Sequence, residues 1–314
     1  MLALCVESSH QRGMGHLFRA LNFHACLLRH GISSMFITNR HGPATDILGQ
    51  RGIPFEIASL DDLESDWEKG LIRKFGISLW LNDRLDTDRR HALCVKSAGV
   101  RLATFDDRGS GAELADLNIA ALIFDDDPPL QGEKVLRGHE YLVLSPEIAT
   151  HRHQRSDAAR ILVTMGGSDT HGVTATVAGI LRKLGKAATL VLGPGFEHNA
   201  GLENVADGFV VKRGVPSLFA EFDRHDLAIT AGGVTPFEAN ACGLPCISIA
   251  TEPFEVAVCR HLEELGSSVY AGFRDDIDER VFSRNLDIAA MSRAGMQRIS
   301  LDGAERILHE LGLA

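Results

Sequence analysis

The chain has 314 residues, of which 45% are hydrophobic and 24% are charged, and its formal net charge is −10 at pH 7. Chains of this length ordinarily form two domains, and this composition is typical of globular proteins. The negative charge argues against a nucleic-acid surface, which needs clustered lysine and arginine. There is no run of about 18 uncharged apolar residues and no basic N-terminal flank, so we expect no membrane span and a cytoplasmic protein.

Short apolar runs alternate with longer amphipathic segments along the whole chain, a pattern typical of parallel sheets covered by helices. In the first half we expect strands at 2–6, 34–38, 55–58, 77–81, 102–105, 121–124 and 141–144. In the second half we expect them at 161–164, 189–192, 208–212, 227–230, 246–249 and 268–271.

Two further segments define the expected domain organisation. The polar segment 151–157 has no apolar period and is the expected linker, which gives domains over residues 1–155 and 156–314. Residues 281–313 have a helical apolar period and are expected to be helical throughout. This terminal helix could cross back to the first domain.

The first expected strand leads into Gly13-Met14-Gly15-His16-Leu17-Phe18-Arg19, a glycine-rich junction at the start of a helix. Glycine allows a ligand to approach the backbone closely, and helix N-termini attract anions. Histidine at position 16 is suited to general acid–base catalysis. Arg19 lies one turn later on the same face and could pair with a phosphate or a sugar hydroxyl. The alternative is a capping loop with an exposed histidine.

Two further junctions lie in the second half of the chain. Thr164-Met165-Gly166-Gly167-Ser168-Asp169 follows a strand, and Ser168 or Asp169 is the expected N-cap. Ala231-Gly232-Gly233-Val234-Thr235-Pro236-Phe237-Glu238 follows another strand, with a helix starting near Pro236 and Glu238 in its first turn. A carboxylate there can accept hydrogen bonds from both hydroxyls of a ribose. The alternative is an ordinary helix start whose dipole Glu238 balances.

Acidic and sulfur-containing residues give weaker signals. Asp106-Asp107 and Asp125-Asp126-Asp127 each follow an expected strand, at the sheet edge where open α/β folds bind ligands. No histidine or cysteine spacing supports a metal there, so we expect none. The six cysteines lack Cys-x-x-Cys spacing and are expected to be reduced and buried.

In this order, the Gly13–Arg19 junction, Met165–Asp169 and the block from Gly232 to Pro245 resemble a known family. It comprises the UDP-sugar hydrolase of the pseudaminic-acid pathway and its relatives in spore coat polysaccharide biosynthesis. Asp106-Asp107 and Tyr141–Glu147 also resemble short blocks of that family. The resemblance implies an α/β protein of the GT-B fold, in which two Rossmann-like, doubly wound parallel-sheet domains face a cleft.

The resemblance also implies a ligand and a reaction. It implies that the C-terminal half binds UDP, and that His16 orients or deprotonates a water that releases the free sugar and UDP without a metal or another cofactor. The nucleotide site is then expected to comprise Gly166, Gly167, Ser168, Asp169, Gly232, Gly233, Thr235 and Glu238. The sugar site is expected to comprise Gly13, Gly15, Arg19, Asp83, Asp106, Asp107 and Glu255.

Two segments depart from the family pattern. Thr251–Glu255 stands where the family has an Asn-Gln pair, and Asn82-Asp83-Arg84 stands where it has Asp-x-Tyr. The first change places a carboxylate where a diphosphate would approach. Two alternatives therefore stay open: a GT-B glycosyltransferase that uses a hydroxyl acceptor in place of water, and an inactive nucleotide-sugar binding protein. The sequence identifies neither the sugar nor the oligomeric state.

Overall fold

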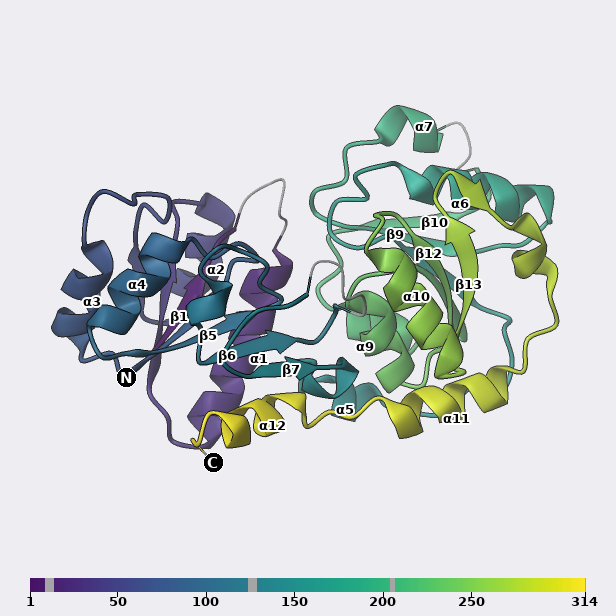
Figure 1. Ribbon diagram of the computed structural model, residues 1–314. Coiled ribbons are helices and arrows are strands. Elements are labelled where there is room, and N and C mark those ends of the chain that lie inside the picture. The colour runs from purple at the N-terminus through teal and green to yellow at the C-terminus, as the bar shows by residue number, and fades with distance from the viewer. Residues whose placement is uncertain (9–13, 124–128, 204–206, 314) are drawn as a thin grey trace. The chain divides into compact units, whose positions relative to one another are not determined.

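The structure is a computed structural model that describes all residues except 9–13, 124–128, 204–206 and 314 (Figure 1). The chain divides into two compact units. The first unit comprises Met1–Leu144 and Asp302–Ala314, and the second comprises Ser145–Leu301. Each unit contains a seven-stranded sheet, and helices connect most of its successive strands.

The sheet of the first unit is parallel throughout, with the strand order β3-β2-β1-β4-β5-β6-β7. Its strands are β1 (Leu2–Val6), β2 (Ser34–Thr38), β3 (Phe55–Ile57), β4 (Leu79–Asp83), β5 (Arg101–Phe105), β6 (Leu117–Ala120) and β7 (Val135–Arg137). The helices are α1 (Gly15–Arg29), α2 (Gly42–Gln50), α3 (Trp67–Phe75), α4 (Arg89–Ser97) and α12 (Gly303–Glu310), with short turns η1 (Ala112–Leu114) and η2 (His139–Tyr141).

Helices cover both faces of this sheet, as the alternation of side chains along β1 shows. Leu2, Leu4 and Val6 lie in one core cluster together with residues of α1, α2 and α12. Ala3 and Cys5 point to the opposite face and lie in a second cluster together with residues of α3 and α4. The first unit is therefore a doubly wound α/β domain.

The second unit has the strand order β10-β9-β8-β11-β12-β13-β14, and all of its pairs are parallel except β13–β14. Its strands are β8 (Ile161–Thr164), β9 (Thr189–Leu192), β10 (Val210–Arg213), β11 (Leu227–Ala231), β12 (Cys246–Ala250), β13 (Ser268–Phe273) and β14 (Asp276–Ile277). Its helices are α5 (Ile148–His151), α6 (Val173–Lys183), α7 (Asn199–Glu203), α8 (Leu218–Phe222), α9 (Thr235–Ala241), α10 (Glu255–Glu264) and α11 (Ile288–Arg298), with η3 (Glu279–Ser283).

The two sheets share a topology that locates ligand sites. In the first unit the chain winds outward from β1 through β2 and β3, then returns to place β4 on the other side of β1. The second unit repeats this arrangement with β8 between β9 and β11. In open α/β sheets, the crevice at such a switch point, outside the carboxyl ends of the strands, is where ligands bind.

The predicted fold class, two doubly wound Rossmann-like domains, is confirmed. The cysteines are free and buried, as predicted. The strands predicted at 2–6, 34–38, 161–164 and 189–192 lie at the predicted positions.

Two predicted strands near the edge of the first sheet are wrong. Residues 121–123 are not a strand, and residue 124 lies outside the described residues; β6 lies just before them. Asn118 concealed β6, because this polar side chain is buried and donates to the carbonyls of Asp107 and Gln131. Residues 141–144 are also not a strand, because β7 takes the edge position next to β6.

The prediction that 281–313 is helical throughout is also wrong. Ile299 adopts an extended backbone at the end of α11, and α12 begins only at Gly303. A side chain at Gly303 would meet the backbone of Leu142, so this glycine allows α12 to pack closely against the end of η2 within the first unit. The break separates α11 in the second unit from α12, which packs on α1 and η2 in the first (Figure 1).

The segment expected to be a linker, residues 151–157, is part of the second unit, and the division of the chain falls after Leu144. The reason is Arg155, which is 3% exposed. Its guanidinium donates to the carbonyl of Phe222 at 2.8 Å and also to that of Cys242. A charge so well supplied with acceptors can be buried, and it fixes this polar segment in place.

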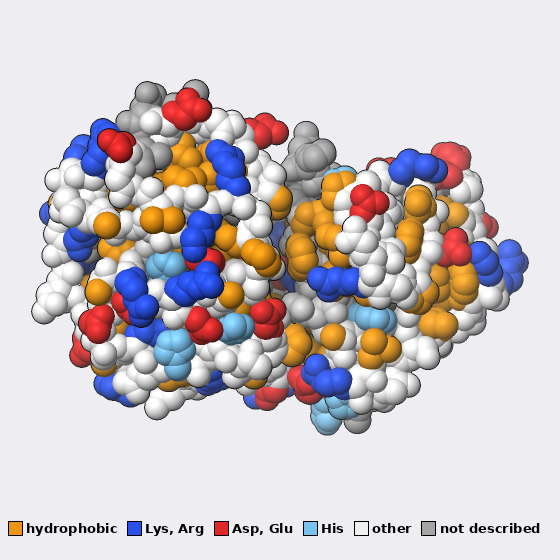
Figure 2. Space-filling model, turned by 180° about the vertical axis from the view of Figure 1, so that it is seen from behind, with side chains coloured by type: hydrophobic (Ala, Val, Ile, Leu, Met, Phe, Trp, Pro, Cys, Tyr) orange, Lys and Arg blue, Asp and Glu red, His pale blue; other side chains and the backbone are white. Residues whose placement is uncertain are grey.

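Two further observations concern the surface and the helices. In the face of the molecule that Figure 2 shows, acidic, basic and histidine side chains are interspersed with hydrophobic ones. Within the described part of the chain, no helix combines the length and hydrophobicity that crossing a lipid bilayer requires.

Candidate functional site

The first candidate group lies at the carboxyl ends of β1 and β4. The parallel register aligns Val6, the last residue of β1, with Asp83, the last residue of β4. His16 follows β1 in the first turn of α1, and its Nδ1 lies 2.6 Å from Oδ1 of Asp83. Topology thus joins a histidine and a carboxylate that are 67 positions apart in the sequence.

Arg19 holds the same carboxylate from the next turn of α1. Its Nε lies 2.7 Å from Oδ2 of Asp83 and its Nη2 lies 2.5 Å from Oδ1, while its Nη1 donates to Asp106 at the end of β5. The guanidinium carbon lies 4.5 Å from the centre of the Phe105 ring. Only 10% of the Arg19 side chain is exposed, so the planar group is fixed in orientation.

The charges of this group follow from its contacts. Burial alone raises the pKa of Asp83, but Arg19 and His16 outweigh it and lower that pKa to about 2. Burial also opposes the charge of Arg19, but Asp83 and Asp106 outweigh that effect and raise its pKa. With one guanidinium and two carboxylates, the group carries one net negative charge when His16 is neutral. Proton uptake by His16 neutralises it.

The ionised carboxylate also sets the tautomer of His16. Because Asp83 can only accept, Nδ1 of His16 donates to it, and in the neutral ring Nε2 then bears the lone pair. Among the residues that the structure describes, Nε2 has no hydrogen-bond partner. The side chain is 14% exposed, so Nε2 is available to accept a proton from a bound molecule.

The two neighbouring aspartates have different surroundings. Asp106 adopts a left-handed backbone with φ of 48°, which aspartate tolerates better than most residues, and its carboxylate reaches Arg19. Asp107 is fully buried and accepts from the backbone N–H groups of Thr87 at 3.0 Å and Gly109 at 2.8 Å. Asp107 therefore orders the loop that follows β4 and is not part of the group around His16.

Of the two glycines predicted for the sugar site, the structure describes only Gly15. Gly15 is exposed as the first residue of α1, and a side chain there would meet no neighbour among the described residues. Gly13 lies outside the described residues, as do the acidic residues 125–127.

The second candidate group begins at the turn between β8 and α6. Gly166 adopts a left-handed backbone with φ of 78°, and the following residues are partly exposed. Within the described chain, the N–H groups of Gly166, Gly167 and Ser168 have no hydrogen-bond acceptor. Gly193, after β9, approaches the carbonyls of Gly166 and Gly167 so closely that any side chain would clash. The turn therefore presents free donors on a fixed backbone, which suits an anion.

The N-cap of α6 is Gly172 and not Ser168 or Asp169 as predicted, but the side chain of Asp169 accepts from the first N–H groups of the helix. Its Oδ1 accepts from the N–H of Val173 at 2.8 Å, and its Oδ2 accepts from the N–H of Thr174 at 2.9 Å. The side chain is buried, so both oxygens are committed to the helix. Ser168 is more exposed than Asp169, and its hydroxyl oxygen lies 3.2 Å from the hydroxyl oxygen of Thr170.

Glu238 lies in the first turn of α9, after the Gly232-Gly233 turn that ends β11. Its side chain has no hydrogen-bond partner among the described residues. Burial raises the pKa of this carboxyl to about 7, so both of its protonation states are accessible near neutrality. A partly buried carboxyl group without a partner among the described residues, at the switch point of a sheet, is typical of a ligand-binding residue. Thr235 is the first residue of the same helix, one position before the predicted start near Pro236.

Glu255 begins α10, in the loop that departs from the family pattern. Its Oε2 accepts from the N–H of Thr251 at 2.7 Å, from the hydroxyl of Thr251 at 2.8 Å and from the N–H of Glu252 at 3.2 Å. Its Oε1 lies 3.8 Å from where a Cβ on Gly233 would be. The carboxylate therefore orders its own loop and also places a negative charge beside the Gly232-Gly233 turn.

Three residues at these two groups were not identified from the sequence. Phe105 supports Arg19, Gly193 supports the Gly166-Gly167 turn, and His171 lies 2.7 Å from Glu252 and so connects two loops of the second unit. The glycine directly after an expected strand was a usable signal for Gly193. The other two contacts depend on tertiary structure.

Comparison with known proteins gives distant relatives. No model of a protein family matches the chain. It is 24% identical over 273 residues to an uncharacterized protein of Methanocaldococcus jannaschii, covering 78% of this chain and 54% of that protein. It is 22% identical over 149 residues to the spore coat polysaccharide biosynthesis protein SpsG of Bacillus subtilis, covering 44% of each. The chain thus spans about half the length of these curated relatives.

Solved structures resemble the whole chain. MurG of Acinetobacter baumannii has a TM-score of 0.70 at 13% identity and covers 100% of this chain and 99% of its own. A glycosyltransferase of Rickettsia africae has a TM-score of 0.68 at 12% identity, covering 99% and 97%. The UDP-GlcNAc 2-epimerase of Neisseria meningitidis, bound to UDP-GlcNAc, has a TM-score of 0.63 at 12% identity and covers 100% of both chains. The chain therefore has the GT-B fold, as expected.

The lowered pKa of Asp83 predicts how stability depends on pH. The carboxylate stabilises the folded state above the pKa of an unfolded aspartate, about 3.9, and this contribution is lost as the pH falls toward 2. We expect the stability difference between the wild type and Asp83→Asn, measured by urea unfolding, to shrink by about 2 kcal/mol between pH 5 and pH 2. The exposed Asp46→Asn should show no such change. A difference that is constant with pH would contradict the ion pairs described for Asp83.

Proposed function

We propose that the protein is a UDP-sugar hydrolase that releases a free sugar and UDP, in the biosynthesis of a surface glycan or of a nonulosonic acid such as pseudaminic acid. The observation that carries this proposal is the His16–Asp83 pair, in which a buried carboxylate holds one ring nitrogen and leaves Nε2 free. This is the arrangement of a general base. The sequence resemblance and the GT-B fold support a nucleotide-sugar as the substrate.

The reaction assigns a role to each residue of the first group. Nε2 of His16 takes a proton from water as the water oxygen bonds to the anomeric carbon. The bond from that carbon to the β-phosphate oxygen breaks, and the electron pair leaves with UDP. Asp83 stabilises the imidazolium that forms, and Arg19 keeps Asp83 ionised and oriented. Attack opposite to the leaving group inverts the anomeric centre.

The second unit holds the nucleotide in this proposal. The free N–H groups of Gly166, Gly167 and Ser168 bind the phosphates, and the carboxyl of Glu238 accepts hydrogen bonds from the ribose hydroxyls. The proposal requires the anomeric carbon of the bound substrate to come within reach of Nε2 of His16. Several structural relatives carry UDP or a UDP-sugar, which supports uridine as the nucleoside.

A glycosyltransferase is the second candidate, because His16 could equally take the proton of an acceptor hydroxyl. The structural relatives include glycosyltransferases, which favours this candidate as much as the first. The two activities differ only in the nucleophile. They are separated by whether a nucleotide is released in the absence of an acceptor.

Removal of the general base provides the central test. We expect the wild type to release UDP from one member of a panel of UDP-, GDP- and CMP-sugars without an acceptor, with or without EDTA. His16→Ala should lower that rate by a factor on the order of 10² to 10⁴. The exposed His309→Gln should leave the rate unchanged.

Three other outcomes would each contradict part of the proposed function. Release only after an acceptor is added would identify a transferase, and binding without turnover would identify a nucleotide-sugar binding protein. Full turnover by His16→Ala would show that His16 is not the base.

The raised pKa of Glu238 predicts a pH dependence of nucleoside binding. Below pH 7 the carboxyl is protonated, and above it the stronger acceptor forms, so uridine affinity should rise through this range. We expect the Kd of uridine, measured by calorimetry, to fall roughly tenfold from pH 6 to pH 8. Glu238→Gln should abolish this dependence, and the exposed Glu279→Gln should preserve it. Uridine affinity that is independent of pH in the wild type would exclude Glu238 from the ribose site.

The charge of Glu255 predicts a selective effect on phosphate binding. Glu255→Gln keeps an oxygen for the Thr251 and Glu252 N–H groups and removes the negative charge beside Gly233. We expect UDP to bind several-fold more tightly to this variant, while uridine affinity stays unchanged. Glu264→Gln, near the other end of α10, is the matched control. Unchanged UDP affinity would place the phosphates away from the Gly232-Gly233 turn.

A further inference from the structure

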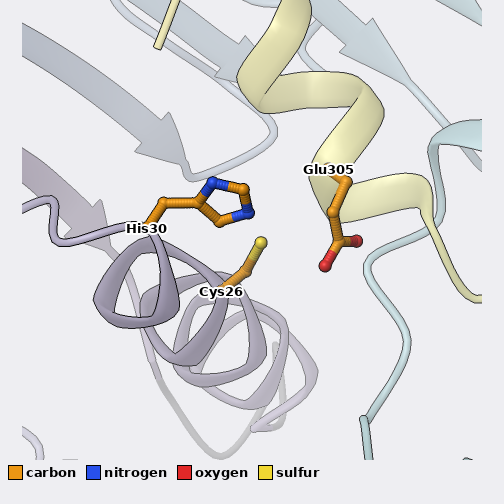
Figure 3. A group of neighbouring side chains, drawn as sticks. All are labelled: Cys26, His30 and Glu305. Atoms are coloured by element: carbon orange, nitrogen blue, oxygen red, sulfur yellow. The ribbon is translucent and has the colours of Figure 1, made fainter. Parts of the chain in front are cut away.

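Three metal-binding side chains meet at the C-terminal end of α1, at the opposite end of this helix from His16. They are Cys26 of α1, His30 at the C-cap of α1 and Glu305 of α12 (Figure 3). One ligand atom from each, a sulfur, a ring nitrogen and a carboxylate oxygen, lies within 4.8 Å of the other two. All three belong to the first unit, so their juxtaposition depends only on the packing inside that unit.

The positions of these residues explain the cluster. Cys26 and His30 are four residues apart, so they lie on the same face of the helix, one turn from each other. That face meets α12, which contributes Glu305 from the far end of the chain. Figure 3 shows the imidazole of His30 and the sulfur of Cys26 turned toward the carboxylate of Glu305.

The donor set indicates which ion would bind. Thiolate and imidazole are ligands of Zn²⁺ and Co²⁺, whereas Mg²⁺ and Ca²⁺ prefer oxygen alone. Zinc bonds to sulfur, nitrogen and oxygen are about 2.0–2.3 Å long, so ligand atoms spread over 4.8 Å need to contract modestly around an ion. His30 is exposed, which allows it to move inward and allows water to take a fourth position.

We propose that Cys26, His30 and Glu305 bind a zinc-type divalent ion that fastens α12 to α1. The ion joins segments separated by more than 270 positions, and such a cross-link restricts the unfolded chain strongly. Because α1 carries His16 and Arg19 at its other end, the ion would also steady the helix that presents the candidate base.

Two features oppose the binding of an ion by these three residues. One limits which metal can bind, and the other provides a variant that should bind more tightly. Burial and the Glu305 carboxylate raise the pKa of the Cys26 thiol to about 11, so the ion must displace that proton, which favours a metal with high affinity for sulfur. Arg29 also competes, because its Nη2 donates to Oε1 of Glu305 at 2.6 Å. Replacing Arg29 with a neutral residue therefore frees a ligand oxygen and removes a repelling charge.

The experiment is a titration of the EDTA-treated full chain with ZnCl₂ by calorimetry, and with CoCl₂ by absorption spectroscopy. We expect one ion per chain, with a sulfur-to-cobalt charge-transfer band. Cys26→Ser should abolish that band, and both Cys26→Ser and His30→Gln should weaken Zn²⁺ binding at least tenfold. Arg29→Gln should strengthen binding several-fold. Cys94→Ser, a buried cysteine of α4, should behave as the wild type.

Several results would overturn the proposal. They are the absence of saturable Zn²⁺ binding by the wild type, wild-type affinity in His30→Gln, or a cobalt band that persists in Cys26→Ser. His30 and Arg29 are exposed, so variants at these positions keep the test valid even if Cys26→Ser fails to fold. Circular dichroism of each variant identifies such a failure. The result does not depend on turnover of any nucleotide-sugar.

Discussion

The parallel pairing of β1 with β4, repeated as β8 with β11, is the constraint on which both candidate groups depend. Each pair joins strands whose connections leave in opposite directions across the sheet, so the loops after them diverge and leave room between them. His16 follows β1 and Asp83 ends β4; Gly166 follows β8 and Glu238 follows β11. His16 and Asp83 are far apart in the sequence and meet because the strand order brings their strands together.

Asp83 shows how the first unit holds a charge in its interior. A fully buried carboxylate is costly unless opposite charges and donors surround it, and here Arg19 and His16 supply both. The same contacts that make the ionised form stable also orient the imidazole. Asp106 binds the remaining side of Arg19, so the guanidinium cannot turn toward another partner without losing an ion pair. Stability and orientation are thus one feature of this group.

The sequence identified local features well and tertiary ones poorly. Glycine junctions and apolar strands such as β1 and β8 depend on neighbouring residues, so they could be predicted. The His16–Asp83 pair could not, because it requires the strand order. β6 was missed because a buried Asn118 interrupts its apolar run, and hydrogen bonds that satisfy this side chain are invisible in the sequence. The break before α12 depends on the close approach of Gly303 to Leu142, which is also a tertiary contact.

The second unit contains groups that attract an anionic ligand and a group that repels it. The free N–H groups from Gly166 to Ser168 favour phosphate, whereas the carboxylate of Glu255, beside Gly233, repels it. Glu238 adds less repulsion than its residue type suggests, because burial keeps it partly protonated near pH 7. A diphosphate bound at this sheet edge would therefore lie toward the Gly166–Ser168 turn and away from Glu255.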